Sequence, residues 1–192
     1  MMVKICGITN REDALAAVEA GASAIGFNFY RESPRYISHT GAAMIGEKIP
    51  ANVWKVGVFV NESAETIAKT VIEAGLDVAQ LHGTSEARGV RTWRAIPAGK
   101  QFRRQISNEV EAVLIDTPSD VFGGSGETWD WATLPNLTQK VIVAGGLDAD
   151  NVRTAIEQAH PWGVDACSRI EKAPGIKDHE KMCKFIQAAL AS

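Results

Sequence analysis

Short runs of apolar residues alternate along the chain with segments in which apolar positions recur every three or four residues. Several of the runs are apolar at successive positions, as in parallel strands that are covered on both faces. Eight strands are predicted, at about residues 3–8, 24–29, 54–60, 78–82, 91–96, 112–116, 141–144 and 163–167. Alternation of such strands with helices predicts an α/β protein.

The segments between the strands carry the start and stop signals of helices. Capping side chains are found at Asn10, Ser63 and Asp178, and glycines end the first two of these helices at Gly21 and Gly75. Another helix is expected from Asn151. The apolar positions predict these inward faces: Leu15 and Val18 in the first helix, Ile67 and Val71 in the second, and Met182, Phe185, Ile186, Ala189 and Leu190 in the last.

Two connections, residues 84–91 and 100–111, are too short for full helices. The chain has 192 residues, whereas a (β/α)8 barrel typically needs about 200 or more. We therefore predict a (β/α)8 TIM barrel with shortened helices after strands 4 and 5, forming one catalytic domain over residues 1–192. A doubly wound open sheet is an alternative that local patterns leave open.

Composition narrows the class of protein. A net charge of −3 with scattered basic residues argues against a nucleic-acid partner. No apolar stretch approaches the roughly 18 residues of a membrane span, and the chain enters a strand directly after Met1, which leaves no room for a signal peptide. The three cysteines are far apart and lack metal-ligand spacing, so we expect no metal, no disulfide framework and a cytoplasmic location.

Cys6 is the first candidate for chemistry, because it stands at the end of the first predicted strand. Lys4 lies two residues earlier and therefore points to the same face. If that face is the barrel interior, the ammonium lies one layer below the thiol and favours the thiolate, which can act as a base or a nucleophile. The alternative is that Cys6 is a small buried hydrophobe.

Asp116 ends the apolar run 112–116 and has two interpretations. Burial beside apolar strand residues would raise its pKa and let it donate a proton near neutral pH. Alternatively it caps a turn, since Thr117 and Pro118 follow. A glycine-rich loop at residues 123–126 comes next and is expected to form a lid.

The last two strands lead into loops that suit a phosphate. Gly145 and Gly146 follow one strand and precede a helix, and Ser168 and Arg169 follow the next strand. Glycines let a backbone approach a ligand closely, and backbone N–H groups at a helix start bind phosphate. Phosphate sites in the loops after strands seven and eight recur among barrels.

Three further polar residues are candidates for the substrate site. Arg35, in the loop after the second strand, could hold a carboxylate with both arms of its guanidinium, or it could be a solvated loop residue. Gln80 and His82 share one face of the fourth strand. The other histidines, His39, His160 and His179, lack ligand spacing and are interpreted as surface groups.

These motifs together resemble phosphoribosylanthranilate isomerase, in order and over residues 3 to about 178. The motifs are Lys4-Ile5-Cys6-Gly7-Ile8-Thr9, Gly26-Phe27-Asn28-Phe29, Ser33-Pro34-Arg35-Tyr36-Ile37, Gln80-Leu81-His82-Gly83, Leu114-Ile115-Asp116, Gly123-Gly124-Ser125-Gly126, Trp129-Asp130-Trp131, Ala144-Gly145-Gly146-Leu147 and Pro174-Gly175-Ile176-Lys177-Asp178.

The resemblance implies an Amadori rearrangement in tryptophan biosynthesis, which needs no cofactor. In that family the aspartate matching Asp116 is the general acid, the cysteine matching Cys6 is the general base, and the arginine matching Arg35 holds the anthranilate carboxylate. Gln80, His82, Gly145, Gly146, Ser168 and Arg169 are expected to complete the substrate site. The partner would be this phosphorylated sugar-anthranilate, and the chain a monomer or a homodimer.

The sequence departs from the family after the eighth strand, where Cys167-Ser168-Arg169 replaces the usual Ser-Ser-Gly. Arg169 is expected to contact the phosphate or to pair with Glu171. The stretch between Gly83 and Trp93 is also shorter than usual. Two other functions stay open: an isomerase of the histidine-pathway aminoaldose phosphate, against which Cys6 argues, and a barrel that binds a phosphorylated ligand without catalysis.

Overall fold

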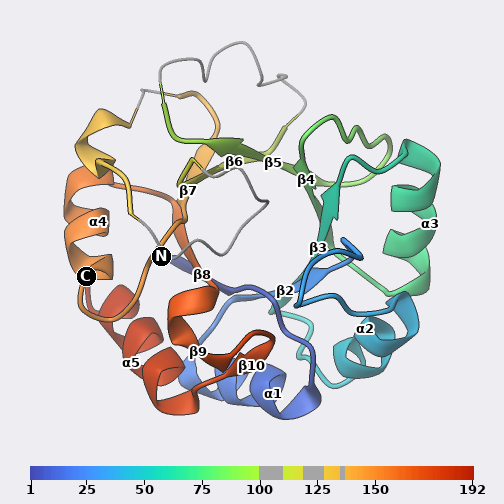
Figure 1. The fold of residues 1–192 in the computed structure, drawn as a ribbon, viewed down its shortest axis with the longest axis horizontal. Coiled ribbons are helices and arrows are strands. Elements are labelled where there is room, and N and C mark those ends of the chain that lie inside the picture. The colour runs from blue at the N-terminus through green and yellow to red at the C-terminus, as the bar shows by residue number, and fades with distance from the viewer. Residues whose placement is uncertain (100–109, 119–127, 135–136) are drawn as a thin grey trace.

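Eight parallel strands form a closed barrel in the computed structural model, which describes residues 1–99, 110–118, 128–134 and 137–192 (Figure 1). Each strand pairs with the next along the chain, and β1 also pairs with β8. The strands are β1 (Met2–Ile5), β2 (Ala24–Asn28), β3 (Trp54–Val60), β4 (Val78–His82), β5 (Thr92–Pro97), β6 (Ala112–Asp116), β7 (Lys140–Val143) and β8 (Gly163–Ala166). This closure confirms the predicted barrel and excludes the open sheet.

The predicted bounds of β3, β4 and β6 agree with the structure, and the other strands differ by one to three residues. The largest difference is in β1, which ends at Ile5, so that Cys6 follows the strand instead of lying within it. The backbone pairing nevertheless continues, because Cys6 N donates to Ala166 O at 2.9 Å. The thiol is therefore anchored at the barrel rim.

Five α-helices cover the outside of the barrel in the described residues (Figure 1). They are α1 (Arg11–Ala20), α2 (His39–Gly46), α3 (Ala64–Glu73), α4 (Val152–Ala159) and α5 (His179–Leu190). The predicted caps are confirmed, since the side chains of Asn10, Ser63 and Asp178 each accept a hydrogen bond from the backbone N–H three residues on. No prediction was made for α2, which Ser38 caps.

Two of the residues predicted to face the barrel, Leu15 and Leu190, are instead exposed. Leu15 is 36% exposed, because the stripe of α1 that meets the barrel is formed by Ala14 and Ala17. Small residues there let α1 pack closely, and Leu15 lies one residue further round the helix. Leu190, at the end of α5, is 49% exposed, whereas the rest of the predicted α5 face is buried. In α3, Ile67 is buried and Val71 partly so.

A shortened helix was predicted between β4 and β5, and the structure has no helix in this connection. Its shape is held by Ser85, whose hydroxyl accepts from Glu62 N at 2.7 Å and whose carbonyl accepts from Arg94 Nη2 at 2.7 Å. Most of the connection after β5, residues 100–109, lies outside the described residues. So does the predicted lid at residues 123–126.

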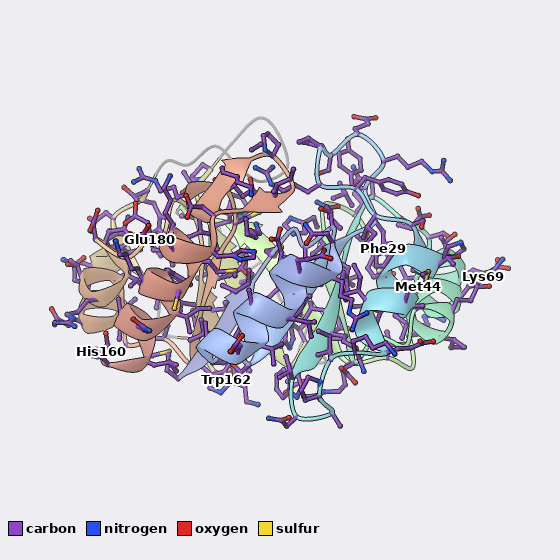
Figure 2. The ribbon with its side chains drawn as sticks, turned by 90° about the horizontal axis from the view of Figure 1, so that it is seen from below. Phe29, Met44, Lys69, His160, Trp162 and Glu180 are labelled. Atoms are coloured by element: carbon purple, nitrogen blue, oxygen red, sulfur yellow. The ribbon has the colours of Figure 1, made fainter. Side chains whose placement is uncertain are left out.

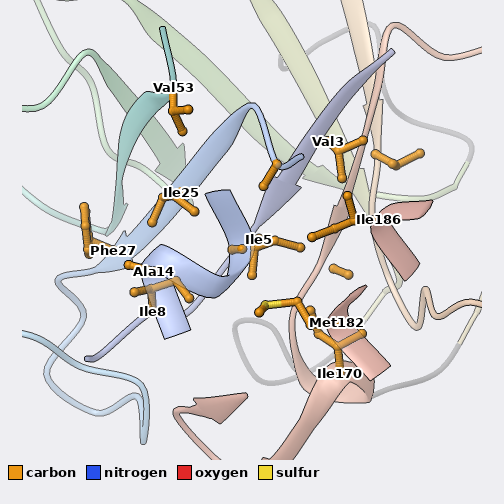
Figure 3. Close-up of a cluster of buried hydrophobic side chains, with 14 of the residues drawn as sticks. Val3, Ile5, Ile8, Ala14, Ile25, Phe27, Val53, Ile170, Met182 and Ile186 are labelled. Carbon is orange, nitrogen blue, oxygen red and sulfur yellow. The ribbon is translucent and has the colours of Figure 1, made fainter. Parts of the chain in front are cut away.

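Two apolar layers hold the barrel together. The outer layer lies between the strands and the helices, where Val3, Ile5 and Ile25 meet Ala14, Met182 and Ile186 (Figure 3). The inner layer includes three tryptophans, Trp54, Trp93 and Trp162, with ring centroids 5.6 to 6.0 Å apart. Trp162 lies at the end of the barrel opposite a two-stranded hairpin formed by residues 171–177 (Figure 2).

That hairpin was not predicted. It consists of β9 (Glu171–Ala173) and β10 (Ile176–Lys177), and a 3-10 helix, η3 (Ser168–Ile170), leads into it from β8. A second 3-10 helix, η2 (Trp131–Thr133), precedes β7. Within the described residues, no helix has the length and apolar character of a membrane span.

Candidate active site

The predicted site residues gather at the end of the barrel where the strands finish. Parallel strands bring their carboxyl ends to one rim, and barrel enzymes build active sites there. Cys6 follows β1, Arg35 lies in the loop after β2, Gln80 and His82 belong to β4, Asp116 ends β6, Gly145 and Gly146 follow β7, and Ser168 and Arg169 follow β8. Six separate stretches of sequence thus share one mouth.

Below Cys6 lies a buried ion pair. Lys4 Nζ donates to Asp165 Oδ1 at 2.9 Å, and the Lys4 side chain is fully buried. Burial opposes the charge of Lys4, yet Asp165 and Cys6 together raise its pKa. Burial raises the pKa of Asp165 to about 7 although Lys4 favours its charged form. We regard the ammonium as the firm charge of the pair, because both groups that raise its pKa, Asp165 and Cys6, are acids.

The Cys6 thiol is held between Lys4 and a second thiol, Cys167. A hydrogen bond from Cys167 and the positive charge of Lys4 lower the pKa of Cys6 well below its ordinary value, against the effect of burial. Gly26 makes room for this arrangement, since a Cβ there would come within 3.0 Å of Cys6 Sγ. The site therefore favours a thiolate at Cys6, as a general base requires.

Asp116 has the opposite shift. Burial raises its pKa to about 6, helped by the nearby Cys6 charge and opposed by a hydrogen bond that its Oδ1 accepts from Thr117 N at 2.8 Å. Gly145 packs directly against this carboxyl, because a Cβ there would lie 2.9 Å from Asp116 Oδ1. An acid with a raised pKa and a base with a lowered pKa face the same mouth, which is the arrangement of a proton-transfer site.

Arg35 is not a solvated loop residue. Its side chain is 11% exposed, and Nε and Nη2 both bind Glu171, with Nη2 at 2.8 Å from Oε2. Glu171 also accepts from the buried Lys177 Nζ at 2.8 Å. These cations hold the pKa of Glu171 below its usual value in spite of burial. Because Glu171 fixes the guanidinium, Arg35 presents a preset cation at the rim.

Gln80 and His82 do share a face, as their spacing predicts. Their Nε2 atoms are 2.9 Å apart. Burial and the charges of Lys4 and Arg94 lower the pKa of His82 to about 4, so the imidazole is neutral and its Nε2 accepts from the Gln80 amide. Gln80 is buried, and its Oε1 has no hydrogen-bond partner among the described residues.

The loops after β7 and β8 meet, but through an ion pair that was not predicted. Arg169 Nη1 binds Asp148 Oδ2 at 2.7 Å. The suggested pairing of Arg169 with Glu171 is therefore wrong, because Glu171 is occupied by Arg35 and Lys177. Gly145 and Gly146 both have positive φ, 89° and 60°, which L side chains rarely adopt. Glycine is therefore favoured at both positions of this turn.

Comparison with known proteins places this geometry in a family. The family model described as N-(5'phosphoribosyl)anthranilate (PRA) isomerase matches residues 3–188. The chain belongs to this family. A relative from Solibacter usitatus, named N-(5'-phosphoribosyl)anthranilate isomerase, is 47% identical over 100% of this chain and 98% of its own.

Solved members of the isomerase family share the fold over the full chain. The phosphoribosyl anthranilate isomerase from Thermotoga maritima has a TM-score of 0.87 and 36% identity, with 100% of both chains covered. Another, with a TM-score of 0.83, 33% identity and 100% of both chains covered, was solved in complex with reduced 1-(o-carboxyphenylamino)-1-deoxyribulose 5-phosphate.

Sequence reasoning missed the charged residues that support the isomerase site: Asp165, Glu171 and Lys177. Asp165 could have been found, because it lies two residues before Cys167 and so shares its face on an otherwise apolar strand. Glu171 and Lys177 depend on the hairpin, which has no clear strand pattern. His39, His160 and His179, which were predicted to be surface groups, are exposed. The described residues contain no cluster of three His, Cys, Asp or Glu side chains that could hold a metal ion.

Proposed function

We propose that this chain is a phosphoribosylanthranilate isomerase, which converts N-(5-phosphoribosyl)anthranilate to 1-(o-carboxyphenylamino)-1-deoxyribulose 5-phosphate in tryptophan biosynthesis. Family membership over residues 3–188 supports the assignment. The observation that carries it is the pairing of a thiol of lowered pKa, Cys6, with a carboxyl of raised pKa, Asp116, at one barrel mouth. An aldose-to-ketose rearrangement needs one acid and one base.

The reaction begins with Asp116 as general acid. Its proton goes to the ring oxygen, the C1–O bond breaks, and the nitrogen lone pair forms the C1=N bond of a Schiff base. Burial keeps part of the Asp116 population protonated near neutral pH, with a pKa of about 6. The anionic substrate raises that share further, because a nearby negative charge favours the protonated acid.

Cys6 performs the second proton transfer. The thiolate removes the proton from C2, and the C–H electrons form the C1=C2 bond while the C1=N electrons return to nitrogen. The product of this step is an enolamine, which tautomerises to the ketone. Lys4, buried below Cys6, stabilises the thiolate before the reaction. The chemistry is acid–base throughout and requires no metal or organic cofactor.

Binding is assigned to the remaining residues. Arg35 holds the anthranilate carboxylate through Nη1 and the second N–H of Nη2, since Nε and the first N–H of Nη2 bind Glu171. The backbone of Gly145, Gly146 and Ser168 holds the phosphate, with Arg169 beside it. Gln80 and His82 line the sugar.

A turnover assay tests the function. The purified chain is mixed with N-(5-phosphoribosyl)anthranilate, and the loss of substrate fluorescence is followed with time. We expect saturable turnover, and none with the histidine-pathway aminoaldose phosphate as the control substrate. Binding of the anthranilate substrate without turnover would instead indicate a barrel that has lost catalysis.

The solved Thermotoga maritima enzyme is described as dimeric, so we also propose a homodimer. Sedimentation would test this oligomeric state. The cytoplasm stays our prediction for its location.

A further inference from the structure

Cys6 and Cys167 are neighbours at the rim, although 161 positions apart in the chain. They follow β1 and β8, whose register pairs Lys4 with Asp165 and Ile5 with Ala166. The Lys4 and Asp165 side chains touch inside the barrel, so the next residues on the same face are Cys6 and Cys167. Each thiol is the largest influence on the pKa of the other.

This geometry suits a disulfide. Paired strands lie about 4.8 Å apart, and the Cα atoms of bridged cysteines are usually about 4.4–6.8 Å apart. The backbone bond from Cys6 N to Ala166 O, at 2.9 Å, shows that the strands are still paired at this level. Alternation along the two strands directs both cysteines to the same side, which brings the two sulfurs to one rim.

The surroundings make Cys6 the reactive member of the pair, because the interaction that lowers the pKa of Cys6 raises the pKa of Cys167. Lys4 lies below Cys6, and Lys177 Nζ lies 3.9 Å from Cys167 Sγ. These cations and the hydrogen bond lower the pKa of Cys6, and low-pKa thiols are the ones that oxidants attack. Both cysteines are half-buried, not sealed from the barrel mouth. All three cysteines of the chain are free in this structure.

We propose that Cys6 and Cys167 form a redox-active pair, which a hydroperoxide closes into a disulfide and a dithiol reopens. Cys6 is the thiol that reacts with the hydroperoxide, and Cys167 is the resolving thiol.

The oxidation balances as two steps. The Cys6 thiolate attacks the terminal oxygen of the hydroperoxide, the O–O bond breaks, and Cys6 becomes a sulfenic acid while an alcohol, or water from hydrogen peroxide, departs. The Cys167 sulfur then attacks the Cys6 sulfur, the S–O bond breaks, and water leaves with the Cys167 proton. The two thiols lose two electrons in total, and the hydroperoxide accepts them.

The disulfide removes the thiolate from Cys6. If Cys6 is the general base, a role that rests on the proposed function, oxidation stops turnover. The resolving thiol also protects Cys6, because a sulfenic acid captured as a disulfide does not proceed to the irreversible sulfinic acid. The pair thus makes inactivation by peroxide reversible.

Thiol counting tests the chemistry without any activity assay. The reduced protein is treated with a small excess of hydrogen peroxide, unfolded, and titrated with a thiol reagent. We expect the count of free thiols to fall from three to one. A digest without reductant should contain the Cys6 peptide linked to the Cys167 peptide, with Cys183 free. An unchanged thiol count, or a bridge that includes Cys183, would overturn the proposal.

Two variants separate the roles. Cys183→Ser, on α5 away from the mouth, should lose activity with peroxide and regain it with dithiothreitol as the wild type does. In Cys167→Ser, prolonged treatment with peroxide should lower the activity relative to that of the untreated, reduced variant. Dithiothreitol should not restore this lost activity. Equal recovery in Cys167→Ser would refute the protective role. A mapped disulfide in a protein without any turnover would sink the proposed function and leave the redox pair standing.

Discussion

At the scale of single residues, Cys6 is the proposed general base and Asp116 the proposed general acid. One is held as a thiolate by Cys167 and Lys4, and the other is held partly protonated by burial. Proton transfer by a positioned group contributes about 10²–10⁴-fold. We expect Cys6→Ala and Asp116→Asn each to lower kcat by at least about a hundredfold.

Substrate affinity should survive in both variants, because neither group is assigned to the carboxylate or the phosphate. Single-turnover kinetics would measure the chemical step and the dissociation constant separately. A variant that keeps more than about a tenth of the wild-type chemical rate would remove that residue from proton transfer.

The pH dependence follows from the raised pKa of Asp116. A general acid works in its protonated form, so its contribution is present below the pKa of about 6 and is lost as the pH rises through that value. We expect kcat/KM to fall about tenfold per pH unit above this point. In Asp116→Asn this limb should be absent and the residual rate flat; a limb that persists in this variant would belong to another group.

Arg35 is expected to act through the shape of its guanidinium. Arg35→Lys keeps the charge but loses the planar guanidinium, which Glu171 holds in place through Nε and Nη2. A charge-assisted hydrogen bond contributes about 1.5–3 kcal/mol, so kcat/KM should fall by about tenfold or more. Arg31→Lys, an exposed residue of the same loop, is the matched control. Unchanged kcat/KM in Arg35→Lys would place the anthranilate carboxylate elsewhere.

At the scale of elements, the loops after β7 and β8 are joined by Arg169 and Asp148. If Arg169 contributes to phosphate binding, Asp148 competes with the phosphate for its guanidinium. Arg169→Gly should then raise KM and weaken its salt dependence, whereas Asp148→Asn should lower KM. Steady-state kinetics at several salt concentrations measures both effects. Salt curves of Arg169→Gly that overlap those of the wild type would mean that Arg169 serves only the ion pair.

The sequence predicted elements well where local signals decide them. The strands are marked by continuous apolar runs, and Asn10, Ser63 and Asp178 mark helix starts through capping bonds that are local in sequence. It failed where tertiary packing decides. The exposure of Leu15 depends on how closely α1 approaches the barrel, and the hairpin that carries Glu171 and Lys177 is held by ion pairs with a distant arginine.

The candidate site likewise contains residues that could be predicted from the sequence and contacts that could not. Cys6 and Asp116 could be predicted because strand ends in a barrel share one rim. The pairing of Arg35 with Glu171 could not, since 136 positions separate them and neither lies in a strand of the barrel. The distinction is between positions that topology fixes and contacts that side-chain packing fixes.

At the scale of the whole molecule, the Lys4–Asp165 pair joins the first and last strands where the barrel closes. Removing one partner of a buried pair leaves an uncompensated charge and costs about 3–5 kcal/mol. We expect Lys4→Met to lower the free energy of unfolding by about that much. Urea unfolding would measure it one pH unit above the Asp165 pKa of about 7, where the carboxyl is charged.

The matched control is Lys184→Met, which breaks an exposed pair with Glu180 on α5 and should change stability little. Lys4→Met combined with Asp165→Leu should recover much of the lost stability, because the buried charge is then gone. Strict additivity of the two substitutions would contradict this coupling. If the double variant recovers stability but not turnover, the barrel can close without the Lys4–Asp165 pair. The pair would then serve the Cys6 thiolate that lies above it.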